Sequence, residues 1–419
     1  MSAADLLDGL DRATVLAAMT PQLPVALVRD LLDCARTREV QIDLLVADLT
    51  GRWDFLDAAA EQDLGQGRLT VTVLAGAVPR RLAGCVEHLP VSLWEADRLL
   101  SSGALPIDIL LARVQRDQSG AGSYGAMLGY TPSALARAGR VGFEVVPGSS
   151  AHPGTELDLQ SADLLVEAAL VVRPAPEATT ATLTQLRIAE LTAALVPDAA
   201  TVQLGVGVIP AEVAALLAHR SDLGLHSGVL PGPVQRLLAH GAVSGAAKGT
   251  DPGRHVATGL LGGDPDGWGP QLLLRPLSYT HDPRVLLSQN RLWALNSAYQ
   301  IDLAGQVNAE YVAGARLSSG GGQADFARAA HAGTGGTVIS LPSRAGDGSP
   351  RIVVRLDCPV TTPGSDVDYV VTEYGVARLT GSTASQRASA LIAVAHPQDR
   401  AGLLRGLACA PSAAVERTG

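Results

Sequence analysis

Short uninterrupted runs of apolar residues alternate along this chain with segments in which apolar positions recur every three or four residues. In the first part of the chain the apolar runs are typical of buried β-strands, and they span Gln41–Leu49, Leu69–Gly76, Ile107–Val114, Val141–Val146 and Ala162–Val172. Helical spacing falls between them, at Pro24–Ala35 and Thr131–Gly139. Strands that alternate with helices predict a parallel sheet with helices on both faces.

A second set of the same kind follows a break in the pattern. Residues Arg173–Gln185 contain two prolines and several threonines, a composition typical of a linker. Beyond it, Thr201–Gly207 predicts a strand and Ile209–Arg220 a helix with Pro210 in its first turn. The strings LWALNSA, GGTVISLP, RIVVRL and DVDYVVTEYG predict later strands, and Thr383–Ala395 predicts a late helix. We therefore predict two doubly wound α/β lobes, 1–180 and 181–419.

Composition excludes several classes of protein. With 47% hydrophobic and 17% charged residues the chain can form real cores, and a net charge of −9 disfavours a nucleic-acid binder. No apolar run approaches the roughly 18 residues that span a bilayer, and the first residues are not an export signal, so we expect a cytoplasmic protein. Four scattered cysteines predict reduced packing residues, and neither cysteine nor histidine spacing predicts a metal site.

Two glycine-rich turns are the first candidates for chemistry. Gly205 and Gly207 join a strand to a helix, where free backbone N–H groups favour an anion. A dinucleotide fold is disfavoured because the next strand end, Gly224–Gly228, carries no carboxylate. The second cluster, Ser318–Phe326, contains three consecutive glycines and predicts either a cradle for a phosphate or oxyanion or a flexible surface loop.

Single residues offer weaker signals. His226 beside Ser227 suggests a hydrolase, but adjacent residues rarely form a nucleophile–base pair and no GxSxG motif is present, which favours a structural role. Lys248 is the only lysine in the chain. Its compact ammonium suits a phosphate or carboxylate, and the alternative is a solvated surface lysine.

Read together in order, these strings resemble the acetyl-CoA hydrolase/CoA-transferase family, which includes 4-hydroxybutyrate and succinyl-CoA:acetate CoA-transferases. The resemblance covers most of the chain from about residue 100 onward, and TEYGVA (Thr372–Ala377) is its most specific part. The other matching strings are SGALPIDILLARV, QLGVGVIPAEV, DLGLHS, HVATGLLGG, ALNSAYQIDLAGQVNAE, GGGQADFARAA, TTPGSDVDYVVTEYGVARLTG and ALIAVAHPQDR.

The resemblance implies a fold and a set of binding residues. The fold would be two CoA-transferase-type lobes with mainly parallel sheets and an active site in the cleft between them, in a homodimer. The substrate would be a coenzyme A thioester, without a metal. The residues implied to bind the substrate or CoA are Gly205, Gly207, Lys248, Asn296, Gly320, Gly321, Gly322 and Gln323.

One departure from the family changes the expected mechanism. In the family a glutamate two residues after a histidine attacks the thioester, and a glutamyl-CoA thioester then forms. Here the corresponding string is Gly224–Gly228, so Gly228 stands where the glutamate is expected, after His226 and Ser227. No glutamate lies between Glu212 and Glu310. The covalent nucleophile is therefore absent from a scaffold that retains oxyanion donors.

Three functions fit this combination. The first is direct acyl transfer from an acyl-CoA to an amine, hydroxyl or carbanion of a second small substrate near Gly228, in specialised biosynthesis. The second is thioester hydrolysis, with His226 and Glu310 as the nearest candidate bases. The third is a non-catalytic CoA-thioester-binding paralogue or partner subunit.

Overall fold

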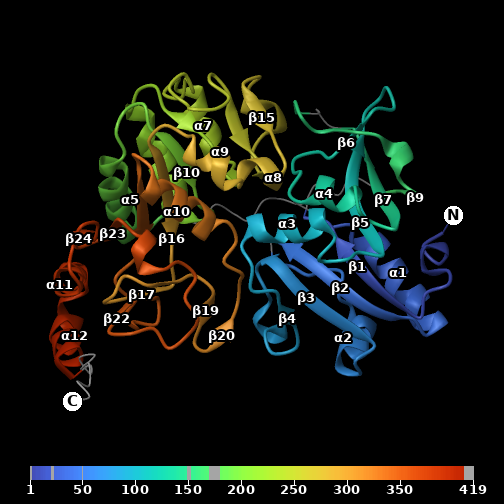
Figure 1. Ribbon diagram of the computed structural model, residues 1–419, viewed down its shortest axis with the longest axis horizontal. Coiled ribbons are helices and arrows are strands. Elements are labelled where there is room, and N and C mark those ends of the chain that lie inside the picture. The colour runs from blue at the N-terminus through green and yellow to red at the C-terminus, as the bar shows by residue number, and fades with distance from the viewer. Residues whose placement is uncertain (1, 20–22, 50, 149–151, 169–179, 410–419) are drawn as a thin grey trace, which may run out of the picture.

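The computed structural model describes residues 2–19, 23–49, 51–148, 152–168 and 180–409 (Figure 1). Two separate sheets lie side by side in Figure 1, one built from the blue-to-green part of the chain and one from the green-to-red part. The predicted α/β class with mainly parallel sheets is confirmed. We propose a domain boundary near residue 180, since residues on either side of it enter different sheets.

The first sheet has a parallel centre. Its central strands run in the order β3-β2-β1-β5-β7-β9, β4 pairs β3 in parallel, and β6 and β8 add short antiparallel pairs. The strands are β1 (Arg12–Ala17), β2 (Gln41–Asp48), β3 (Leu69–Gly76), β4 (Glu87–His88), β5 (Ile109–Arg116), β6 (Gly122–Ser123), β7 (Arg140–Pro147), β8 (Glu156–Leu157) and β9 (Leu164–Glu167). The five predicted strands are present, β3 with the predicted bounds and the other four with shifted bounds, and residues 169–172 of the last lie outside the described residues.

Helices cover both faces of this sheet, as the alternation of strands and helices predicted. Alternate side chains of β2 point to opposite faces: Leu44 joins the cluster that contains Leu27 and Leu31 of α1, and Leu45 joins the cluster that contains Leu100 of α3. The helices are α1 (Val25–Arg38), α2 (Ala58–Gly65), α3 (Leu93–Ser102) and α4 (Thr131–Leu135). The last is shorter than the predicted Thr131–Gly139.

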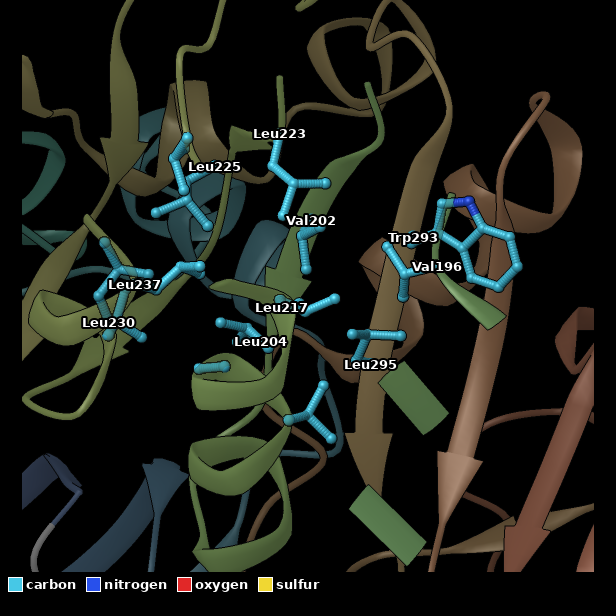
Figure 2. Close-up of a cluster of buried hydrophobic side chains, with 14 of the residues drawn as sticks. Val196, Val202, Leu204, Leu217, Leu223, Leu225, Leu230, Leu237, Trp293 and Leu295 are labelled. Carbon is cyan, nitrogen blue, oxygen red and sulfur yellow. The ribbon is translucent and has the colours of Figure 1, made fainter. Parts of the chain in front are cut away.

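The second sheet runs β11-β10-β16-β21-β23-β24, with only β24 antiparallel. Its strands are β10 (Thr201–Leu204), β11 (Gly224–Leu225), β16 (Leu292–Ser297), β21 (Gly336–Ser340), β23 (Tyr369–Thr372) and β24 (Gly375–Arg378). Figure 2 shows the apolar side chains of β10, β11 and β16 packed with those of the neighbouring helices into one buried cluster. The predicted strand DVDYVVTEYG contains β23 and the turn that joins it to β24, with which β23 forms a hairpin.

The remaining elements frame the second sheet. The helices are α5 (Leu183–Leu195), α6 (Val208–Leu216), α7 (Val234–Ala239), α8 (Leu277–Thr280), α9 (Pro283–Leu287), α10 (Gln323–Ala332), α11 (Ala384–Val394) and α12 (Pro397–Cys409). The short strands are β12 (Val229–Pro231), β13 (His255–Ala257), β14 (Gly259–Leu261), β15 (Leu272–Leu274), β17 (Gln300–Asp302), β18 (Val307–Asn308), β19 (Tyr311–Val312), β20 (Ala315–Arg316) and β22 (Ile352–Val353).

The predicted linker is wrong at its carboxyl end. Thr182 is the N-cap of α5, and its hydroxyl and the Gln185 side chain form a capping box, so Leu183–Gln185 are helical. Threonine and glutamine satisfy the first N–H groups of a helix as readily as they occupy a linker, which composition alone does not reveal. Residues 173–179 of the predicted linker lie outside the described residues.

Three further features of the described residues concern membrane-spanning helices, metal ligands and cysteines. No helix there is long and apolar enough to cross a membrane. No group of three or more His, Cys, Asp or Glu side chains there is arranged to hold a metal ion. Cys34, Cys85 and Cys358 are free, and Cys85 is exposed, which corrects the predicted packing role for that residue.

Backbone hydrogen bonds join the two sheets around the glycine-rich loop Ser319–Gly322. Ser319 N–H donates to Gly76 O at the end of β3 (3.1 Å), and Gly321 O accepts from Leu93 N–H at the start of α3 (3.1 Å). A loop held on both sides by main-chain atoms is a fixed element, so the alternative prediction of a flexible surface loop is wrong. The loop lies at the junction of the two sheets, close to α3 in Figure 1.

Lys248 fixes the end of β11. Its side chain is only 5% exposed, and Nζ donates to Leu225 O (2.9 Å) and Arg254 O (3.0 Å). A Cβ at Gly224 would lie 2.4 Å from Lys248 Cγ, so the first glycine of the Gly224–Gly228 string makes room for this side chain. The prediction of a solvated surface lysine is wrong, and binding of a CoA or substrate anion stays a prediction.

We expect Lys248→Met to lower the free energy of unfolding by about 1–3 kcal/mol, because the buried carbonyl of Leu225 and the partly buried carbonyl of Arg254 lose their donor. Urea unfolding measures this, and Arg236→Met on the exposed side of α7 is the control, expected within about 0.5 kcal/mol of wild type. Titration of the folded variant with acyl-CoA tests the other role. Unchanged stability with weakened binding would show that the ammonium serves a ligand and not the fold.

Candidate functional site

The carboxyl ends of three parallel strands meet beside the glycine-rich loop. β10 pairs with β11 on one side and with β16 on the other, so the connections leave β10 in opposite directions. In open α/β sheets, ligands bind outside the carboxyl ends of the strands at such a reversal. The residues that follow these strands are therefore the candidate site, and they include Gly205, Gly228 and Ser297.

A pair of buried amide side chains bridges β10 and β16. Gln203 and Asn296 exchange two side-chain hydrogen bonds, of 2.8 and 3.1 Å, and both side chains are buried. A Cβ at Gly205 would lie 3.0 Å from Asn296 Oδ1. Asn296, one of the predicted binding residues, lies at the candidate site, but its side chain already bonds to Gln203.

Val206, which follows Gly205, is 55% exposed and offers an apolar surface beside the end of β10.

Three N–H groups of the loop make no hydrogen bond to the described residues. Gly320 O accepts from Gln323 N–H and Gly321 O from Leu93 N–H, whereas the N–H groups of Gly320, Gly321 and Gly322 donate to none of the described residues. Gln323 begins α10, and its side chain donates to Ser297 O and accepts from the hydroxyl of Thr362, which ties the loop to the end of β16. Consecutive free N–H groups ahead of a helix suit an anion or an oxyanion.

His226 and Ser227 are buried parts of the scaffold. His226 Nε2–H donates to Thr280 O (3.0 Å), and its Nδ1 is enclosed without a partner among the described residues. The Ser227 hydroxyl bonds to the backbone of Leu204 at the end of β10. Both side chains are fully buried, which agrees with the structural role that their adjacency favoured.

Gly228 faces a residue that the sequence analysis did not single out. A Cβ on Gly228 would lie 3.4 Å from both Cε1 and Nε2 of His281, and a Cβ on Gly322 would lie 2.4 Å from the same Nε2. His281 follows α8 and is 1% exposed, with its ring edge-on to Phe326. The imidazole therefore lies between the position expected for a glutamate and the glycine-rich loop. Its sequence context, YTHDP, carries no motif, so only proximity in space reveals it.

Glu310 lies under the same loop but is already bound. Its Oε2 accepts two hydrogen bonds from Arg316, of 2.5 and 2.9 Å, and its Oε1 accepts from the Thr361 hydroxyl at 3.0 Å. A Cβ on Gly320 would lie 3.2 Å from Glu310 Oε1, so the carboxylate supports the loop from beneath. Both carboxylate oxygens are therefore engaged within the protein, Oε2 by the Arg316 guanidinium and Oε1 by the Thr361 hydroxyl. This arrangement disfavours Glu310 as a general base.

Burial keeps the histidines of this region neutral. Burial is the main reason that the pKa values of His226 and His281 fall to about 3 and that of His255 to about 4, and the positive charge of Lys248 lowers those of His226 and His255 further. The pKa of Lys248 itself falls to about 8, again because of burial. The imidazoles are therefore proton acceptors and not cations at neutral pH.

These shifts predict a fall in stability on acidification. A histidine whose pKa is depressed by folding binds its proton first in the unfolded chain, so its contribution is complete above about pH 6.5 and is lost as the pH falls towards 3. The buried Asp97 and Asp325 act in the opposite sense, because burial raises the pKa of each to about 6.

Urea unfolding at pH values between 6.5 and 4.5 gives the slope of the unfolding free energy against pH. This slope should be smaller in His226→Gln than in wild type by up to about 1.4 kcal/mol per pH unit, the effect of one proton bound only by the unfolded chain. An equal slope in His226→Gln and wild type would contradict the buried neutral imidazole.

Comparisons with known proteins address the family directly. Residues 267–407 match the acetyl-CoA hydrolase/transferase C-terminal domain. The chain is 42% identical over 161 residues to 4-hydroxybutyrate coenzyme A transferase of Clostridium kluyveri, a match that covers 36% of this chain and 38% of that protein. It is 31% identical over 134 residues to the acetyl-CoA hydrolase of Candida albicans, covering 32% and 25%. These matches thus cover well under two thirds of the curated relatives.

Two solved structures match over nearly the whole chain. RipA from Yersinia pestis superposes with a TM-score of 0.85 at 28% identity and covers 97% of this chain and 96% of that one. The 4-hydroxybutyrate CoA-transferase of Porphyromonas gingivalis gives a TM-score of 0.76 at 27% identity, covering 97% of both chains. The resemblance to the acetyl-CoA hydrolase/CoA-transferase family is confirmed: residues 267–407 match the acetyl-CoA hydrolase/transferase C-terminal domain, and the fold is similar to that of CoA-transferases.

Proposed function

We propose that this chain binds an acyl-CoA thioester beside the loop Ser319–Gly322 and transfers the acyl group directly to a second small substrate, without a glutamyl-CoA intermediate. The observation that carries the proposal is Gly228, which faces His281 and the loop but offers no nucleophile. The names of the relatives, CoA transferases and an acetyl-CoA hydrolase, support the thioester as substrate.

The free N–H groups of Gly321 and Gly322 would hold the thioester carbonyl oxygen. Attack on the carbonyl carbon places negative charge on that oxygen, and fixed backbone donors stabilise this charge more than they stabilise the ground state. Removal of one such donor in other acyl-transfer enzymes costs about 10²–10³ in kcat. The exposed Val206 at the end of β10 would contact an apolar part of a substrate.

The missing side chain at Gly228 would leave room for the acceptor. Gly228 has an ordinary backbone conformation, and its N–H donates to none of the described residues. An amine or hydroxyl of the second substrate could then approach the thioester carbon from the side where a glutamate would otherwise stand. Specialised biosynthesis, a cytoplasmic location and a homodimer stay predictions.

Thioester hydrolysis is the second candidate, and one observation favours it. A neutral imidazole close to the loop could activate water as well as an amine or hydroxyl. The two functions share the oxyanion donors and differ in the nucleophile. Product analysis separates them, because hydrolysis yields free acid in the absence of any acceptor, whereas acyl transfer requires one.

Intact mass spectrometry of wild type after mixing with acyl-CoA should show no adduct, because position 228 has no carboxylate. Gly228→Glu should acquire an adduct of the mass of a glutamyl-CoA thioester, since a Cβ there makes only an ordinary 3.4 Å contact with His281. Gly228→Gln, of the same size and uncharged, is the matched control and should acquire none.

The gain of transfer activity in Gly228→Glu should be modest, because a misplacement of about 1 Å can cost about 10²-fold. Native acyl transfer should fall in both variants if the second substrate occupies this space. An adduct on wild type at any glutamate would contradict the proposal. So would a Gly228→Glu protein that folds, keeps full native activity and forms no adduct.

A further inference from the structure

The imidazole of His281 lies buried beside Gly228 and the loop, and acyl transfer as proposed above gives it no role. Its Nε2 has no hydrogen-bond partner among the described residues, and unlike His226 Nδ1 it is not fully enclosed. A side chain at Gly322 would overlap Nε2 itself. The two glycines therefore keep side chains of their own away from this nitrogen.

The Thr280 hydroxyl lies beside the ring. It is 2.9 Å from His281 Nδ1 and 3.3 Å from Pro276 O, which also accepts two backbone N–H groups. When the hydroxyl donates to Pro276 O, it accepts from Nδ1–H, and the lone pair of the ring is then on Nε2, beside Gly228 and Gly322. When it donates to Nδ1 instead, Nε2 carries the proton. The carbonyl of the same residue holds His226, so Thr280 positions both rings.

We propose that His281 Nε2 is the proton acceptor that activates the second substrate, with Thr280 as its positioning residue. The assignment rests on the proposed acyl transfer, whose acceptor would lie beside Gly228. It gives the site a base held by an orienting group, the arrangement by which enzymes activate a weak nucleophile.

The reaction balances with this base alone. The acceptor oxygen or nitrogen bonds to the thioester carbon while its proton moves to Nε2, and the carbonyl π electrons move to the oxygen at the loop N–H groups. When the tetrahedral intermediate collapses, the C–S bond breaks and the CoA sulfur leaves with the proton from Nε2–H. An acyl-CoA and an acceptor X–H thus give acyl-X and CoA-SH, and His281 returns to its neutral form.

Burial holds the free ring neutral, and its pKa of about 3 makes it a weak base until charge develops beside it. Negative charge on the carbonyl oxygen then develops a short distance from Nε2, and an opposite charge nearby raises the proton affinity of an imidazole. Proton transfer by a positioned side chain contributes about 10²–10⁴ in rate.

Steady-state kinetics of four variants test the assignment. With any acyl-CoA and acceptor pair that wild type turns over, His281→Gln and His281→Ala should lose about 10²–10⁴ in kcat with KM for the acyl-CoA changed by less than about threefold. Thr280→Val should lose about tenfold, and Thr280→Ser, which keeps the hydroxyl, should match wild type. Far-UV circular dichroism and thermal unfolding establish that each variant folds.

Nitrogen-15 NMR of histidine-labelled protein supplies a readout that needs no turnover. His281 should show the Nδ1–H tautomer in wild type and Thr280→Ser and lose it in Thr280→Val. An Nε2–H tautomer in wild type overturns the assignment, as does kcat within about threefold of wild type in His281→Gln. Failure of the proposed function is distinguishable, because wild type would then turn over no acyl-CoA with acceptor or water, whatever the tautomer.

Discussion

The His281 imidazole packs against two glycines from distant parts of the chain, and this close approach determines the geometry of the candidate site. The loop before α10 can reach the ring only because Gly322 carries no side chain at the point of contact, since a Cβ there would overlap the ring nitrogen. A Cβ on Gly228 would merely touch the ring. Packing thus requires glycine at position 322, whereas position 228 would tolerate a Cβ.

Neighbouring residues hold His281, the Gly224–Gly228 string and the loop Ser319–Gly322 in place. Thr280 binds one histidine through its carbonyl and contacts the other through its hydroxyl, while Lys248 binds the carbonyl of Leu225 within the Gly224–Gly228 string. Gly76 of β3 and Leu93 of α3 bond to the backbone of the loop. The N–H groups of Gly320, Gly321 and Gly322 donate to none of the described residues. Pre-positioned donors of this kind need no reorganisation when charge develops on a substrate.

The fold was largely predictable from pattern, because apolar runs such as those of β2 and β3 are buried on both faces and leave little ambiguity. The sequence analysis did not predict β1, although this strand is central to its sheet. Arg12 and Thr14 interrupt the run of apolar residues in the sequence, and several of the preceding residues are acidic. The capping box of Thr182 was missed because threonine serves linkers and helix N-caps alike.

The site was predictable only where sequence-local geometry defines it. The glycine-rich loop and Gly228 were found because a glycine turn and a missing carboxylate can both be recognised within one string. His281 was not found, since its role depends on segments far apart in the chain that meet only after folding. The bonds of Asn296 to Gln203 and of Glu310 to Arg316 likewise form only in the folded chain. They occupy the polar side chains of two predicted site residues that a ligand would otherwise contact.

The most direct test of this account is a crystal structure of the protein with an acyl-CoA analogue in which the thioester sulfur is replaced by a non-cleavable group. The account predicts that the analogue carbonyl oxygen lies within hydrogen-bond distance of the N–H groups of Gly321 and Gly322. It also predicts that the acyl carbon faces the space between Gly228 and His281 Nε2. An analogue whose acyl carbonyl binds away from the loop, or whose CoA moiety occupies another face of the protein, would contradict it.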